Sequence, residues 1–126
     1  MATQCLPRIK GCSFKIPYTV GIPNSDLCVL LGNLLKNALE ACLRHKSDDS
    51  FIKLNARPVG SKMLVITVAN GYVEKPRAIL NGFVSAKRDS IGTGAYSVRR
   101  IAQSHNGEAL FEWKDGVFYA SITMRY

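Results

Sequence analysis

The chain has 126 residues and a formal net charge of +8, with 47% hydrophobic and 21% charged residues. This length suits one domain with a single core and leaves no room for a second. No apolar run reaches the roughly 18 residues that cross a bilayer, and the first residues lack a secretory signal pattern, so we expect a cytoplasmic domain. The basic residues are scattered without interleaved aromatics, which favours a solvated surface over a nucleic-acid-binding one.

The N-terminal part carries little pattern. Residues 1–11 are predicted to be a linker or an expression remnant, and residues 12–126 to be the domain. A strand is predicted at 12–20, where Pro17 indicates an edge or a bulge. The cysteines have no C-x-x-C spacing, so we expect four reduced, small hydrophobic residues, with Cys28 and Cys42 on the buried side of the following helix (Cys5, Cys12, Cys28 and Cys42).

The pattern of residues 26–46 predicts a long amphipathic helix with Ser25 as its N-cap. At 100° per residue its apolar side chains form one broad arc. That arc consists of Leu27, Leu30, Leu31, Leu34, Leu35, Ala38 and Cys42. Asn33 and Asn37 lie one turn apart at the edge of the arc, where the core meets solvent. Alone, this pair fits a surface position as well as a functional one.

The string N-L-L-K-N-A-L-E-A at residues 33–41 resembles the N box of the GHKL superfamily of ATP-binding domains, which includes gyrase and the histidine kinases. The resemblance implies that Asn37 helps to bind the Mg²⁺ ion that bridges the ATP phosphates. Such a role suits the chemistry, because Mg²⁺ takes hard oxygen ligands and usually only one or two from protein. In hydrolysing members a Glu occupies the position of Asn33, and Asn has no base function.

The remaining elements predict an α+β two-layer sandwich, with a mainly antiparallel mixed sheet and helices on one face. Residues 51–59 and 63–69 form a predicted hairpin, and 109–113 and 117–124 a second one. The segment from 72 to 90 is predicted to be largely loop with one short helix. A second helix is expected after Ser90, with its buried side formed by Ala95, Val98, Ile101 and Ala102 and its C-cap by Asn106-Gly107.

The sequence G-T-G at residues 92–94 stands directly before that helix, where backbone N–H groups can approach phosphates. It resembles the second glycine box of histidine kinases, which implies nucleotide contacts for Gly92, Thr93 and Gly94. Asn70 occupies the place of the family's adenine-binding Asp, and its amide oxygen can still accept a hydrogen bond from the adenine amino group. In this respect the chain is similar to the quorum-sensing receptors of the accessory-gene-regulator (AgrC) and VirS type.

The lid of those receptors corresponds to F-V-S-A-K-R, which implies ATP contacts for Ser85 and Lys87. Lys87 fits two interpretations equally, a contact to the γ-phosphate and a solvated loop lysine.

The resemblance implies the catalytic domain of a sensor histidine kinase, whose parent protein sits in the membrane. Its ligands would be ATP and Mg²⁺, and its partners the dimerisation helix that bears the phosphoacceptor histidine and, indirectly, a response regulator. We expect a monomer, because no long heptad pattern is present. Neither His45 nor His105 has a neighbouring carboxylate in the sequence, so both are predicted to be surface residues. Two alternatives stay open: an interaction module that has lost nucleotide turnover, and a stand-alone serine kinase of the anti-sigma-factor type.

Overall fold

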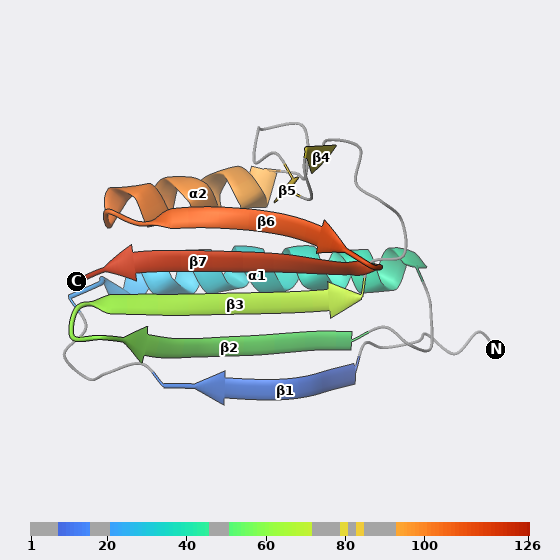
Figure 1. Cartoon of the computed structure of the whole chain (residues 1–126), viewed down its shortest axis with the longest axis horizontal. Helices are drawn as coiled ribbons and strands as arrows, with labels where there is room; N and C mark the ends of the chain where they lie inside the picture. The colour runs from blue at the N-terminus through green and yellow to red at the C-terminus, as the bar shows by residue number, and fades with distance from the viewer. Residues whose placement is uncertain (1–7, 16–20, 46–50, 72–78, 81–82, 85–92) are drawn as a thin grey trace.

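The computed structural model describes residues 8–15, 21–45, 51–71, 79–80, 83–84 and 93–126 (Figure 1). Two helices are present in these residues, α1 (Asn24–His45) and α2 (Thr93–Ser104). The strands are β1 (Arg8–Phe14), β2 (Phe51–Val59), β3 (Met63–Gly71), β4 (Ile79–Leu80), β5 (Phe83–Val84), β6 (Glu108–Lys114) and β7 (Val117–Arg125). None of the described helices is long and apolar enough to cross a membrane.

The strands form one sheet in the order β1-β2-β3-β7-β6-β5-β4. Only the pair of β1 and β2 is parallel among the described strands, and the others are antiparallel. Both helices lie on the same face of this sheet, behind it in the view of Figure 1. The predicted fold class is therefore confirmed: an α+β two-layer sandwich with a mainly antiparallel mixed sheet and helices on one face.

Alternating burial on the long strands shows which side chains meet the helices. The inward positions of β2 and β3 are buried, while their neighbours are half-buried or exposed except for Ala69, which is also buried. This two-residue period gives each strand one apolar face. The buried cluster contains Leu30, Leu34, Ala38, Ile52, Leu54, Ala56, Leu64, Ile66, Val68, Ala95, Val98, Ala102, Phe111, Ala120, Ile122 and Met124, among others.

Two tight turns fix the hairpins. Gly60 takes φ +67 between β2 and β3. Asp115 and Gly116 both have positive φ, 51 and 79, between β6 and β7. A two-residue loop with positive φ at both positions has the twist that antiparallel strands require. Both predicted hairpins are confirmed.

The long helix is also confirmed, although its buried side is narrower than predicted. Leu27, Leu30 and Leu34 are buried, but Leu35 is 38% exposed and Cys28 is exposed. A helix on one layer of sheet buries a stripe of about 100°, and these two residues lie beyond it. The predicted burial of Cys28 is therefore wrong; the side chain of Cys42 lies outside the described residues.

The predicted cap at Ser25 is also wrong, because α1 already begins at Asn24. The carbonyl of Pro23 accepts hydrogen bonds from the N–H groups of Asp26 and Leu27, at 3.1 and 3.2 Å. Ser25 consequently lies inside the first turn.

Two predicted stretches differ from the structure. β1 begins at Arg8, inside the predicted linker, because its parallel pairing starts with Arg8 opposite Phe51. It ends at Phe14, whereas residues 16–20 of the predicted strand lie outside the described residues. Of the segment from 72 to 90, predicted to be largely loop with one short helix, the structure describes only Ile79–Leu80 and Phe83–Val84, which pair as short strands. β5 pairs with β6 through Phe83 and Glu112, which extends the sheet.

Candidate functional site

Asn33 and Asn37 are half-buried on α1, between its buried face and solvent. The buried face is formed by Leu30, Leu34 and Ala38, which are at most 3% exposed. Because four residues separate the asparagines, their side chains lie one turn apart on the same side of the helix. The two carboxamides are therefore at the predicted border between core and solvent.

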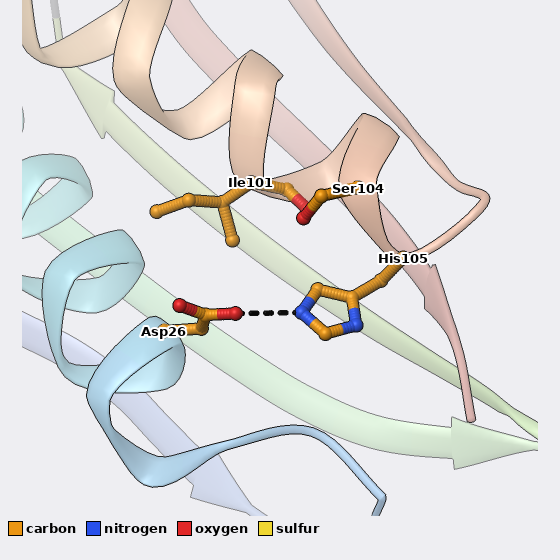
Figure 2. A network of polar contacts seen from close by, with 4 residues as sticks. All are labelled: Asp26, Ile101, Ser104 and His105. Atoms are coloured by element: carbon orange, nitrogen blue, oxygen red, sulfur yellow. Dashed lines mark hydrogen bonds and ion pairs between the residues drawn. The ribbon is translucent and has the colours of Figure 1, made fainter.

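Asn33 and Asn37 lie on the side of α1 that faces α2. Near the start of α1, the carboxylate of Asp26 contacts Nε2 of His105, which directly follows α2, at 2.8 Å (Figure 2). Asp26, Asn33 and Asn37 lie within about 40° of one another around the helix axis. The side of α1 that contacts the end of α2 therefore also presents both carboxamides.

The first turn of α2 lies level with these carboxamides. The helices run side by side in opposite directions (Figure 1). From His105 back to Thr93 the helix rises about 18 Å, and the same rise from Asp26 along α1 leads to Ala38, next to Asn37. The N–H groups of Thr93 and Gly94, in the first turn, have no partner within the helix and lie at its positive end. This end of α2 therefore suits an anion close to Asn37.

Asn70 lies near the end of β3 and is only 3% exposed. Alternation places its side chain on the same face as Ile66 and Val68, toward the helices. Its Nδ2 donates a weak hydrogen bond to the carbonyl of Gly71 at 3.3 Å. Within the described part of the chain its Oδ1 accepts no hydrogen bond, and a buried acceptor without a partner costs about 1–3 kcal/mol. A ligand N–H at this point would offset that cost.

Predicted site residues from three elements therefore lie on the same side of the molecule. β3 runs toward the side of the molecule where the C-terminal half of α1 and the first turn of α2 also lie (Figure 1). Asn70 comes from the sheet, Asn37 from α1, and Thr93 and Gly94 from α2. The other predicted site residues, Ser85, Lys87 and Gly92, lie outside the described residues.

A shallow depression on the exposed side of α2 is a separate feature. It is lined by Tyr96, Arg99, Arg100, Gln103 and Ser104. The guanidinium of Arg100 stands 5.9 Å from the centre of the Tyr96 ring, and its Nη1 is 3.5 Å from the Tyr96 hydroxyl. Of the predicted nucleotide-binding residues that the structure describes, none lines this depression.

The contact between His105 and Asp26 was not predicted. The structure corrects the prediction of a surface role for His105, since its side chain is only 16% exposed and paired with a carboxylate. No local signal in the sequence indicates this pair, because 79 residues separate its members.

Comparison with known proteins places these observations in a family. A family model described as GHKL domain matches residues 23–125, which include α1, β3 and α2. A comparison with curated protein sequences finds no match.

Solved structures of histidine kinases share the fold. The catalytic domain of histidine kinase ThkA has a TM-score of 0.69 at 18% identity, covering 93% of this chain and 79% of that one. Mycobacterial sensor histidine kinase MprB has a TM-score of 0.70 at 14% identity, covering 93% and 83%. Histidine kinase AdeS of Acinetobacter baumannii has a TM-score of 0.68 at 14% identity; the match covers 97% of this chain but 55% of that one. At such identities the likeness shows the fold, not the activity.

Proposed function

Because this chain belongs to the GHKL domain family, we propose that it is the ATP-binding catalytic domain of a two-component sensor histidine kinase. In this proposal it donates the γ-phosphoryl group of ATP to a histidine on a separate dimerisation domain. The parent kinase sits in the membrane with this domain in the cytoplasm, and a response regulator receives the phosphoryl group afterwards.

One observation carries the proposal: the buried carboxamide of Asn70 near the end of β3, whose Oδ1 accepts no hydrogen bond from the other residues that the structure describes. A purine amino group is a donor that can satisfy this oxygen, and α2 offers N–H groups to an anion level with Asn37. A base site on the sheet and a phosphate site at the start of α2, on the same side of the molecule, fit a nucleotide. This arrangement supports ATP over a ligand with only one of the two groups.

The residues present also fit a Mg²⁺ ion. Asn37 offers one carboxamide oxygen at the border of the core, where it is half-buried and still reachable. One protein oxygen is enough, because Mg²⁺ keeps most of its ligands as phosphate oxygens and water. When bound, the ion neutralises charge on the transferring phosphoryl group.

The other proposed residues position the phosphates. The N–H groups at Thr93 and Gly94 would hold phosphate oxygens at the start of α2, with Gly92 just before them. Ser85 and Lys87 are proposed to close over the γ-phosphate, with Lys87 as a point charge.

Asn33 distinguishes transfer from hydrolysis. Its carboxamide cannot take a proton from water at neutral pH, so this position supplies no general base. We expect little hydrolysis, which suits a domain that must keep ATP until an acceptor histidine arrives. Stand-alone serine kinases of the anti-sigma-factor type normally have a Glu base and an adenine-binding Asp. This chain has Asn33 and Asn70 at those positions, which disfavours that alternative.

Calorimetric titration of the chain with ATP, with and without Mg²⁺, tests the proposal. We expect binding at one site that weakens strongly without Mg²⁺, and weaker binding of GTP, which presents a carbonyl where adenine has its amino group. The decisive second step adds a fragment with the dimerisation helix and follows transfer from γ-labelled ATP. Absence of any nucleotide binding would instead support the interaction module.

A further inference from the structure

The contact between His105 and Asp26 joins the two helices at the end opposite the proposed nucleotide site. Nε2 of His105 stands 2.8 Å from Oδ2 of Asp26, with the side chains 16% and 38% exposed (Figure 2). The carboxylate accepts, so Nε2 carries the donated hydrogen. Such a contact is directional and charge-assisted, unlike the apolar packing beside it.

His105 is itself held in place from the α2 side. The N–H groups of Asn106 and Gly107 donate to the carbonyls of Gln103 and Ala102, and Asn106 takes φ 55. These are the bonds of a Schellman cap, so the turn has a defined geometry. The carbonyl of His105 also accepts a hydrogen bond from the N–H of Arg125 in β7, at 2.8 Å. The imidazole therefore extends from a backbone fixed to both α2 and the sheet.

Asp26 is equally well defined on the α1 side. It lies in the first turn of α1, where its N–H donates to the carbonyl of Pro23 at 3.1 Å. A carboxylate in the first turn also interacts favourably with the positive end of the helix. The contact therefore joins two well-anchored points on different helices.

The buried side chains of α2 determine its position along α1 less precisely than the His105–Asp26 contact does. They are Ala95, Val98 and Ala102, which are small and apolar. Apolar packing is non-directional, so it opposes a small shift of α2 along its own axis less sharply than a hydrogen bond does. A 2.8 Å hydrogen bond responds to the same shift at once, because its strength falls steeply as its geometry worsens.

We propose that the His105–Asp26 contact is a positioning contact that fixes α2 along α1 and so sets the height of the first turn of α2 relative to Asn37. Its consequence for ligands rests on the proposed function: a shift of α2 would move the N–H groups at Gly94 away from phosphates bound near Asn37. The axial coupling itself requires no ligand. His105 and Asp26 touch no reacting atom in this proposal and act only through α2.

The test measures amide resonances of ¹⁵N-labelled, nucleotide-free protein for the parent and for Asp26→Ala and His105→Ala. If the contact sets the position of α2, both variants move the resonances of Gly94 and Ala95, about 15–17 Å along the helix axis from residue 105. Asp26→Asn, which keeps an acceptor oxygen, should return them toward the parent values. Resonance changes confined to the surroundings of residues 26 and 105 would overturn the proposal.

Ser104→Ala is the matched control. Its hydroxyl donates to the carbonyl of Ile101 at 2.7 Å, next to the pair but within α2 (Figure 2). Its removal should leave Gly94 and Ala95 unchanged. Should an alanine variant fail to fold, His105→Gln and Asp26→Asn provide the comparison, because each keeps a hydrogen-bonding group of similar reach.

Titration with ligands separates this inference from the proposed function. We expect Asp26→Ala to weaken Mg-ATP binding about three- to tenfold, in line with the loss of one hydrogen bond, and to leave adenosine binding unchanged. The double variant should be no weaker than the single ones. Equal loss for adenosine and Mg-ATP would contradict positioning of the phosphate end. If the parent binds no nucleotide, the proposed function fails, while the resonances still decide the positioning role.

Discussion

Gly107 lies against the backbone of Thr123 so closely that a Cβ at position 107 would stand 1.7 Å from the Thr123 carbonyl oxygen. No real contact is this short, and neither backbone can yield easily. Gly107 ends the cap of α2, and its N–H donates to the carbonyl of Ala102 at 2.9 Å. Thr123 belongs to β7, near the centre of the sheet. The passage from α2 into β6 therefore depends on a residue without a side chain.

Gly107→Ala should destabilise the protein by about 3 kcal/mol or more, because overpacking against a backbone forces the cap or β7 to move. Chemical denaturation followed by circular dichroism measures the change. Gly32→Ala is the control, since nothing lies within 4 Å of a Cβ built there in α1. It should stabilise the protein by about 0.5–1 kcal/mol through helix propensity. Equal stabilities for the two variants would contradict the close approach at Gly107.

Asn37→Ala should abolish Mg-dependent ATP binding and leave the fold intact, because the side chain is at the border of the core. Calorimetry with Mg-ATP and a thermal melt measure the two properties. Asn55→Ala is a matched control: this carboxamide is also half-buried, but it lies on the sheet face away from the helices. Unchanged affinity in Asn37→Ala would remove the metal assignment.

Asn70 should show opposite effects on stability and binding. Asn70→Leu removes a buried oxygen that accepts no hydrogen bond from the described residues, so the melting temperature of the free protein should rise, whereas ATP binding should weaken by about 1–3 kcal/mol. Asn70→Asp should preserve or tighten ATP binding through a stronger acceptor. Since it also buries a carboxylate at a position 3% exposed, the free protein should be less stable at neutral pH. If both variants bind like the parent, the base is held elsewhere.

Gly94→Val should reduce nucleotide affinity, because a β-branched side chain at the second residue of α2 crowds phosphates that approach its first turn. Gly94 lies within α2 and therefore has a helical φ. The expected loss of affinity consequently comes from crowding of the phosphates and not from backbone strain. Gln103→Val, at an exposed position of the same helix, provides the control for helix propensity. Equal Mg-ATP affinities for parent and Gly94→Val would show that this glycine has no part in binding.

Local patterns predicted most of the fold. The apolar period of residues 26–46 predicted α1, and alternation between turn residues predicted the four strands of both hairpins. The same period could not predict the width of the buried stripe, which depends on what covers α1. Leu35 and Cys28 are exposed for this reason. β1 was misplaced because parallel pairing with β2 is a non-local interaction that leaves little pattern in the sequence.

Placement of the site residues follows the same division. Asn33 and Asn37 could be placed at the border of the core because both lie on one regular helix. The burial of Asn70 depends on the elements packed against β3, among them α1. The pair of His105 and Asp26 exists only because α1 and α2 run in opposite directions side by side (Figure 1), which no local pattern states.

The isolated chain should not phosphorylate itself, although the structure gives one of its histidines a carboxylate partner. A phosphoacceptor needs an accessible ring nitrogen close to the γ-phosphate. Nε2 of His105 is engaged by Asp26, and the side chain is only 16% exposed. His105 also lies about 18 Å along the helix axis from Thr93, so phosphates bound at the start of α2 are far from its ring within one chain. His45 is followed by Lys46 and lacks an adjacent carboxylate in the sequence.

Incubation of the purified domain with γ-labelled ATP and Mg²⁺ checks this expectation. No acid-labile label should appear on this chain alone, and label should appear on a fragment with the dimerisation helix once it is added. His105→Ala should leave that transfer possible, though slower if α2 shifts, because His105 is not the acceptor. Acid-labile label on the isolated parent chain that disappears in His105→Ala would show that His105 accepts the phosphoryl group, and the proposed division between catalytic and acceptor domains would be wrong.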